Sequence, residues 1–297
     1  QGFRDVTPAF GLRAALILLV LIAIAPVCAM LVKSSLSEQQ ARLDRAQSNL
    51  RSVVDLAAAH QERIVGGARE VLAAIASSPA LTSTNWTECA AYMERLQASS
   101  LIAHGSFGVL DAKGNLACRA EPPPRAVNSA DRHFFRAAVA TGRFSVGEHV
   151  IRRATGKSAL PFGSPVYSTA DRTLRGVAYL ALDLDRSAAH LRHVALPREI
   201  ELLVTDYRGT VLASSEASGA GIGESLSHGF LLPAIAQGRS GAGRATDADG
   251  AQWLYDVRPV GRSDEGMLYV AGVMSTSQVL APATRSEEHT SELQSPM

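Results

Sequence analysis

Residues 134–147 read FFRAAVATGRFSVG, and residues 230–243 read FLLPAIAQGRSGAG. The two segments share a phenylalanine, two alanines, a Gly-Arg pair and a final glycine at corresponding places. The copies lie about 95 residues apart, far more than the 20 to 50 residues typical of solenoid repeats. The chain therefore contains two copies of one small module in tandem.

The segments around each copy match as well. Residues 109–116, VLDAKGNL, match residues 204–211, VTDYRGTV, and both read as a strand, a tight turn and a second strand. Two further pairs follow the helix: Pro165-Val166 with Pro259-Val260, and YLALDL from Tyr179 with YVAGVM from Tyr269. Each copy therefore predicts a hairpin, a short helix and three strands. This is an α+β module, an antiparallel sheet with helices packed on it.

Composition excludes several classes of protein. The 297 residues are 46% hydrophobic, enough for a core of one or two domains and too apolar for a disordered chain. The 29 Lys and Arg residues nearly balance 28 Asp and Glu residues, which argues against a nucleic-acid partner. HExxH, paired CxxC and GxSxG motifs do not occur. We therefore expect neither metal nor cofactor, and a binding protein rather than an enzyme.

An uncharged apolar segment, AALILLVLIAIAPVCAMLV, occupies residues 14–32. As a helix it is about 28 Å long, which predicts a transmembrane helix. The alternative is a cleaved signal peptide, because Val27-Cys28-Ala29 resembles a cleavage site. Arg4 and Arg13 precede the segment, so the positive-inside rule places residues 1–13 in the cytoplasm and the rest of the chain outside.

One long helix is predicted over residues 34–78. Apolar residues recur there every seven positions: Leu36, Leu43, Leu50, Ala57, Ile64 and Val71, with Val54, Ala68 and Ile75 between them. Two interpretations stay open: the stripe packs on the chain's own sheets, or it forms the seam of a homodimer. Gly66-Gly67 is the expected bend, and Ser77-Ser78-Pro79 the expected end.

With these elements the chain resembles the double Cache sensor domain of bacterial transmembrane receptors, over about residues 34–280. The most specific stretches are DRHFFRAAVATGRFSVGEHVIRRATGKSALPFGSPVY from Asp131 and GVAYLALDL from Gly176. The resemblance implies PAS-like modules, membrane-distal over residues 79–190 and membrane-proximal over residues 191–280. It also implies a periplasmic sensor at the bacterial inner membrane. The output domain, a histidine kinase, diguanylate cyclase or chemoreceptor module, is then missing.

The two copies differ where a ligand would bind. The first copy has Asp131-Arg132 where the second has Ser227-His228. An arginine at the mouth of a sheet pocket presents a planar fork of donors that fits a carboxylate. The sequence Arg132-His133-Phe134-Phe135 resembles the Arg-x-aromatic-aromatic ligand motif of the family. The resemblance implies that Arg132 takes a ligand carboxylate and that Asp183 takes an amino group.

The ligand class stays open between an amino acid and a small organic acid. Amino-acid-binding members of the family prefer Trp and Tyr where this chain has Phe134 and Phe135. For an organic acid, Lys157 or Ser158 at the pocket rim is expected to hold a second carboxylate. In the alternative interpretation Arg132 pairs with Asp131 or Asp183 only to fix the helix on the sheet. The chain would then be an extracytoplasmic structural or adhesion module without a ligand.

Cysteines and the final residues complete the expectations. Cys89 and Cys118 fall in the exported part, where a disulfide between them is expected, with two buried thiols as the alternative. Residues 285–295, RSEEHTSELQS, match the translation of a common sequencing adapter. Residues 285–297 are therefore expected to be an artefact and are excluded from the fold.

Overall fold

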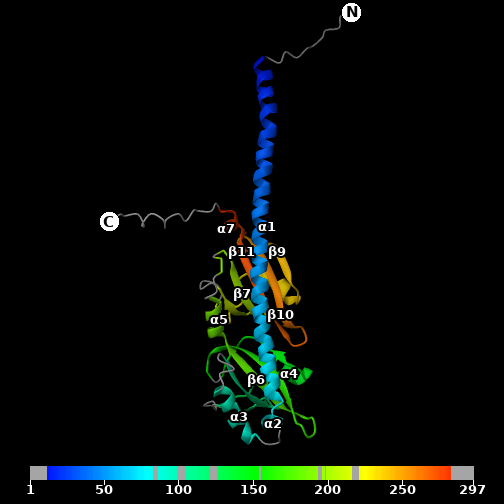
Figure 1. Ribbon diagram of the computed structural model, residues 1–297. Helices are drawn as coiled ribbons and strands as arrows, with labels where there is room; N and C mark the ends of the chain where they lie inside the picture. Colours follow the sequence, from blue (N-terminus) through cyan, green and yellow to red (C-terminus); the bar gives the residue numbers. More distant parts are fainter. Residues whose placement is uncertain are drawn as a thin grey trace, which may run out of the picture. The chain divides into compact units, whose positions relative to one another are not determined.

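The computed structural model describes residues 12–82, 86–98, 105–120, 126–153, 155–192, 196–197, 199–215 and 221–281 (Figure 1). It divides into one unit of Gln1–Ala46 with Val279–Met297, and a second unit, Gln47–Gln278, which holds both sheets. Residues 1–11 and the suspected adapter tail, 285–297, lie outside the described residues.

The helices are α1 (Leu12–Ala76), α2 (Pro79–Thr82), α3 (Thr87–Ala98), α4 (His133–Thr141), α5 (Leu184–Arg192), the 3-10 helix η1 (Gly229–Leu231), α6 (Leu232–Ala236) and α7 (Thr276–Leu280). The first-module strands are β1 (Gly105–Asp111), β2 (Leu116–Cys118), β3 (Ser145–Val146), β4 (Val150–Ile151), β5 (Ser158–Tyr167) and β6 (Leu174–Asp183). The second-module strands are β7 (Glu201–Asp206), β8 (Val211–Ser214), β9 (Gly241–Thr246), β10 (Gln252–Arg262) and β11 (Gly266–Ser275).

Both sheets have the same strand order. The first runs β2-β1-β6-β5-β3, with β4 also paired to β5, and the second runs β8-β7-β11-β10-β9. All of these pairs are antiparallel. The last strand of each copy, β6 or β11, sits in the middle of its sheet and is largely buried. The duplicated α+β architecture predicted from the repeat is therefore confirmed.

The register of the two sheets corrects the sequence alignment by two residues. Pro165 lies opposite Val177, whereas its counterpart Pro259 lies opposite Tyr269. Val177 therefore corresponds to Tyr269, and the predicted match between Tyr179 and Tyr269 is wrong. The pairing of the central strands with β1 and β7 gives the same correction. A period-2 apolar strand matches itself equally well after a shift of two, so sequence similarity did not fix this register.

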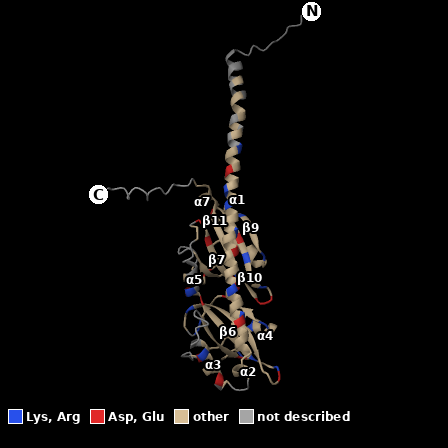
Figure 2. Cartoon of the chain, in the orientation of Figure 1, with Lys and Arg blue, Asp and Glu red and all other residues tan. Residues whose placement is uncertain are grey.

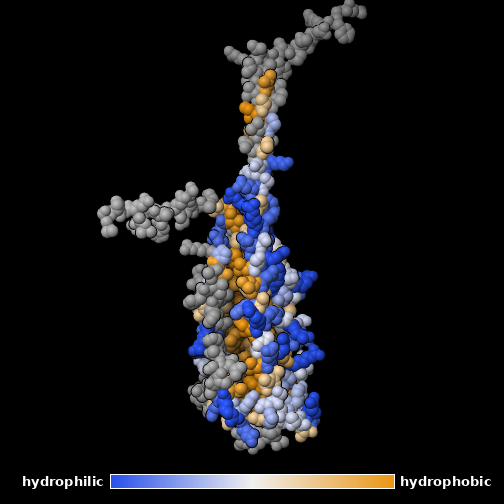
Figure 3. Space-filling model, in the orientation of Figure 1, coloured by the Kyte–Doolittle hydropathy of each residue, from blue (hydrophilic) through white to orange (hydrophobic). Residues whose placement is uncertain are grey.

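Helix α1 is continuous through Gly66-Gly67 and ends at Ala76, next to the expected end at Ser77-Ser78-Pro79. Leu50 and Val54 are fully buried and pack on β11, where a Cβ added to Gly272 would lie 2.5 Å from Val54. At least this part of the stripe therefore packs on the chain's own sheet. In Figure 3, hydrophobic residues form a strip beside α1, over β6, β7 and β11.

Further along α1 the buried face shifts by one residue. Val65 and Leu72 are buried, while Ile64 and Val71, which the heptad repeat favours, are only half-buried. An α-helix drifts by about 20° per heptad, so a step of eleven residues, from Val54 to Val65, keeps the same face toward the sheet. The helix thus follows its natural twist along the sheets.

Polar contacts also hold α1 along β10. The Gln47 amide donates to the carbonyl of Tyr255 at 3.1 Å. The Asp55 carboxylate pairs with Arg258 at 2.8 Å. In Figure 2, basic and acidic residues are interspersed over the described part, with no block of one sign, in keeping with the net charge of +1.

Among the described residues, no helix is both long enough and apolar enough to cross a bilayer. The transmembrane helix expected over residues 14–32 is therefore not found there. Most side chains of that segment, at residues 14–18, 20–22, 27, 29, 31 and 32, lie outside the described ones.

The two modules and α1 meet at the turn between β10 and β11. The Val146 amide of β3 donates to the Glu265 carbonyl at 2.6 Å. The Glu265 carboxylate pairs with Arg69 of α1 at 2.5 Å, and the side chain of Glu265 is only 9% exposed. Arg143, just after α4, pairs with Asp264 at 2.7 Å. One turn of the second module thus contacts both α1 and the first module.

Candidate ligand-binding site

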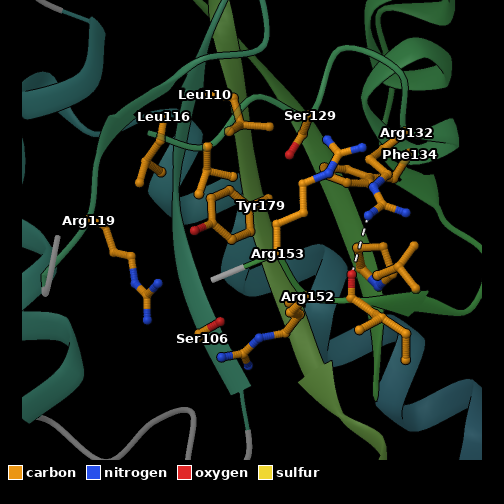
Figure 4. Close-up of a pocket in the computed structure, with 15 residues that line it drawn as sticks. Ser106, Leu110, Leu116, Arg119, Ser129, Arg132, Phe134, Arg152, Arg153 and Tyr179 are labelled. Carbon is orange, nitrogen blue, oxygen red and sulfur yellow. Dashed lines mark hydrogen bonds between the residues drawn. The ribbon is translucent and has the colours of Figure 1, made fainter. Parts of the chain in front are cut away.

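A cavity of about 80 Å³ lies on one face of the first sheet (Figure 4). Its walls come from β1, β2, β5 and β6, from the start of α4 and from residues 150–153. Seven polar or charged side chains line it: Ser106, Arg119, Ser129, Arg132, Arg152, Arg153 and Tyr179. Among the described residues, no aspartate or glutamate lines it. The cavity is therefore strongly basic.

Arg132 and Phe134, both predicted as ligand residues, line this cavity because α4 begins there. Arg132 is the residue before the helix, with extended backbone (φ −78°, ψ 139°). Its Nη2 donates to the Ile151 carbonyl at 3.2 Å. The buried Phe134 ring lies against Tyr179, with centroids 6.5 Å apart. The start of α4 thus supplies one charged wall and one apolar wall.

Arg153 is committed to an ion pair. It contacts Asp131 through two hydrogen bonds, of 2.6 and 2.9 Å, and also donates to the Asn128 carbonyl. These side-chain hydrogen bonds lower the pKa of Asp131 to about 2, so its carboxylate stays ionised at neutral pH. Asp131 thus pairs with Arg153, and among the described residues no ion pair joins Arg132 to Asp131 or to Asp183.

Arg119 and Arg152 are less constrained. Arg119 directly follows β2, and Arg152 directly follows β4. Neither guanidinium has an ion pair or a hydrogen bond with a described residue. Burial, and then the positive charge of Arg119, lower the pKa of Arg152, while Asp183 acts in the opposite direction. Two like charges therefore share this side of the cavity.

Two hydroxyl groups accompany these arginines. In Figure 4 the guanidinium groups of Arg119 and Arg152 gather with the hydroxyls of Ser106 and Tyr179, and Arg132 lies across the Tyr179 ring from them. Burial raises the pKa of the Tyr179 phenol, although the two arginine charges lower it in part. The phenol therefore stays protonated at neutral pH and can donate a hydrogen bond.

The other predicted site residues lie elsewhere. Phe135 is buried in the core between α4 and the sheet. The Asp183 carboxylate lies 3.9 Å from Lys157 Nζ and accepts a hydrogen bond from the amide of Arg186 in α5. The Ser158 hydroxyl lies 3.2 Å from His149 Nε2. None of these four predicted residues, Phe135, Asp183, Lys157 or Ser158, lines the cavity.

The second module fills the corresponding place with aromatic side chains. With Pro165 set against Pro259, Pro161, which lines the cavity, corresponds to Tyr255. The Tyr255 ring packs 5.8 Å from Phe230 and against the core of the second module. At this position the first copy has a proline that lines the cavity, whereas the second copy has a tyrosine ring packed into its core. That difference is visible in the sequence and is the signal that the prediction missed.

A disulfide anchors the strand that carries Arg119. Cys89 of α3 and Cys118 of β2 are joined, with Cα atoms 6.0 Å apart, and both are buried. The alternative of two buried thiols is thus not what the structure shows. Because Arg119 follows Cys118 directly, the bridge ties one wall of the cavity to α3.

Comparisons with known proteins place this fold. A family model described as Cache domain, dCache_1, matches residues 37–283. The extracellular domain of rpHK1S-Z16, assigned as a histidine kinase, superposes with a TM-score of 0.66 at 19% identity, covering 80% of this chain and 98% of that one. The amino acid chemoreceptor PctC of Pseudomonas aeruginosa, solved with GABA, gives 0.58 at 20% identity, covering 77% and 99%. Chemoreceptor CtaA of Pseudomonas fluorescens, solved with L-isoleucine, gives 0.62 at 16% identity, covering 82% and 97%. No curated protein matches the chain.

Proposed function

Because this chain belongs to the Cache domain family, we propose that its first module binds a small carboxylate-bearing molecule and that the chain is the extracytoplasmic sensing region of a signalling receptor. The histidine-kinase and chemoreceptor neighbours support the receptor assignment through their shared fold. The chemoreceptor structures solved with GABA, L-serine and L-arginine support a small-molecule ligand.

The observation that carries the proposal is the arginine-lined cavity of the first module. Four guanidinium groups converge on a space without a carboxylate among its described lining residues. Arg119, Arg132 and Arg152 are half-buried, and positive charge that is partly removed from water is costly unless an opposite charge compensates it. A ligand carboxylate supplies that charge, and it is held most strongly by the bidentate geometry that arginine offers.

The proposed mechanism is binding rather than catalysis. A ligand shifts an equilibrium between two conformations only by its difference in affinity for them. A coupling of about 1 to 3 kcal/mol suffices for a receptor response. The contacts of the β10–β11 turn with the first module and with α1 provide a route for this coupling.

A thermal-shift screen of the full chain tests the proposal. A carboxylate at one hundred times its Kd should stabilise the chain by about 2.7 kcal/mol. Arg132→Ala should reduce the shift, whereas Arg136→Ala, on the exposed side of α4, should leave it unchanged. The unliganded melting temperatures of both variants show whether they fold. If no carboxylate or amino acid stabilises the chain, the sensing function is refuted and the structural-module alternative gains support.

A further inference from the structure

We infer that the cavity takes a small dianion, a dicarboxylate or a phosphate, held between Arg119 and Arg152. This inference rests on the proposed function and specifies the ligand class of the same site. It assigns the leading role to two arginines that the ligand motif at the start of α4 does not contain.

The arginines that line the cavity differ in how far their charges are compensated. Of the four lining arginines, Arg153 is neutralised by Asp131 at 2.6 Å. Arg132 donates a hydrogen bond to the Ile151 carbonyl and has no ion pair among the described residues, although its charge also acts on Asp131. Arg119 and Arg152 have no ion pair among the described residues. Three positive charges thus face the cavity, and one carboxylate neutralises only one of them.

The surroundings disfavour a zwitterionic ligand. An amino acid brings an ammonium group, which needs a carboxylate partner in the site. The nearest candidate from the sequence, Asp183, lies outside the cavity lining, where Lys157 approaches it at 3.9 Å and the Arg186 amide donates to it. An ammonium group in the cavity would therefore meet guanidinium groups and no acidic side chain among the described lining residues. Like-charge contact of this kind is a usual means of rejecting the wrong ligand.

The placement of the two free arginines fits two acidic oxygens or groups. Arg119 follows the end of β2 and Arg152 follows the end of β4, so two different strands bring their guanidinium groups to the same side of the cavity (Figure 4). Each guanidinium is a rigid fork that suits a carboxylate or a phosphate. The hydroxyls of Ser106 and Tyr179 lie beside them as further donors (Figure 4). The guanidinium groups donate only, and the two hydroxyls can donate as well, so the grouping suits a dianion.

Isothermal titration calorimetry on the full chain at pH 7.5 tests the inference. The probes are succinate, inorganic phosphate, the monoanion propionate, and the zwitterions GABA and L-serine. We expect succinate or phosphate to bind at least tenfold more tightly than propionate, and the zwitterions to bind more weakly still. Tighter binding of succinate would identify the ligand as a dicarboxylate, and tighter binding of phosphate would identify it as a phosphate.

Variants assign the binding to the named residues. Arg119→Gln and Arg152→Gln should each weaken the binding of the preferred dianion at least tenfold, whereas Arg136→Gln should not change it. If a glutamine variant does not fold, the lysine variant at the same position, Arg119→Lys or Arg152→Lys, is tested in its place, because lysine keeps the charge but lacks the planar fork of donors. Propionate or an amino acid binding as tightly as both dianions overturns the inference, as does dianion binding that survives both glutamine changes. Either result leaves the sensing function standing. If none of the five probes binds, the dianion inference fails, and the thermal-shift screen against a wider set of carboxylates and amino acids decides the sensing function.

Discussion

Removal of the Cys89–Cys118 disulfide should destabilise the first module far more than the second. The two cysteines are 29 residues apart in the sequence. In the chain-entropy treatment, a loop of that length restricts the unfolded state by about 3.6 kcal/mol at 25 °C. Replacement of both residues by alanine should therefore lower the free energy of unfolding of this module by about 3 to 4 kcal/mol.

The two tryptophans of the chain allow each module to be followed separately. Trp86 stacks under Arg175 of the first module, 4.3 Å from the guanidinium carbon, and Trp253 packs on the core of the second. Urea unfolding is measured by fluorescence in Trp253→Phe and Trp86→Phe backgrounds. Both backgrounds also carry Cys28→Ala, since Cys28 is an exposed free thiol.

The expected result is a large loss in the Trp86 transition and a change below about 0.5 kcal/mol in the Trp253 transition. Chemical reduction of the parent should reproduce the loss. A loss below about 1 kcal/mol would show that α3 and β2 stay together without the bond. Equal losses in both transitions would show that the modules unfold as one cooperative unit, and the assignment of the bridge to one module would be refuted.

Three further predictions concern ion pairs and a close backbone approach. The lowered pKa of Asp131, about 2, means that its pair with Arg153 stabilises the fold above about pH 4 and is lost as the pH falls toward 2. Because both side chains are well exposed, Arg153→Gln should lower the free energy of unfolding by less than about 1 kcal/mol at pH 7, and should not change it at pH 2, in urea titrations. An equal loss at both pH values would contradict this. Glu265→Gln breaks the pair with Arg69 and should cost about 1 to 3 kcal/mol in the same assay, whereas an unchanged midpoint would show that this contact contributes nothing. Gly176→Ala would place a methyl group against the Leu110 carbonyl and should lower the free energy of unfolding by more than about 2 kcal/mol, as measured by thermal melting. Gly66→Ala, in open space, should be neutral or stabilising. Similar effects of the two substitutions would contradict the packing described.

The fold was largely predictable because it is repeated. Matching turns and strand patterns in two copies predicted the α+β modules, and the apolar stripe predicted the long helix, but not whether the helix packs on the sheets or on a second copy. The register of β11 was not predictable, because a period-2 strand matches equally well after a shift of two residues. Beyond Val54 the prediction is correct for Ala68 and Ile75, which are buried, but the heptad count favoured Ile64 and Val71 over the buried Val65 and Leu72, because it neglects the slow drift of a straight helix.

The candidate site was predictable only where one segment carries it. Arg132 and Phe134 line the cavity because both belong to the start of α4. Arg119 and Arg152 reach it through the strand order β2-β1-β6-β5, which brings together residues far apart in the sequence. Lys157 was expected at the pocket rim, and instead pairs with Asp183 outside the cavity lining. Side-chain pairing of this kind depends on residues that are distant in the sequence, so no local sequence pattern predicts it.

Helix α4 gives the first module a short mechanical lever. Its first turn carries the cavity wall, and the residues after its last turn hold Arg143 and Val146, which contact the β10–β11 turn. Nine helical residues span about 13 Å and bend little over that length. A tilt at the first turn would therefore displace the residues that follow the last turn. Under the proposed function, a ligand in the cavity would then shift the contacts with the β10–β11 turn without rearranging the sheet.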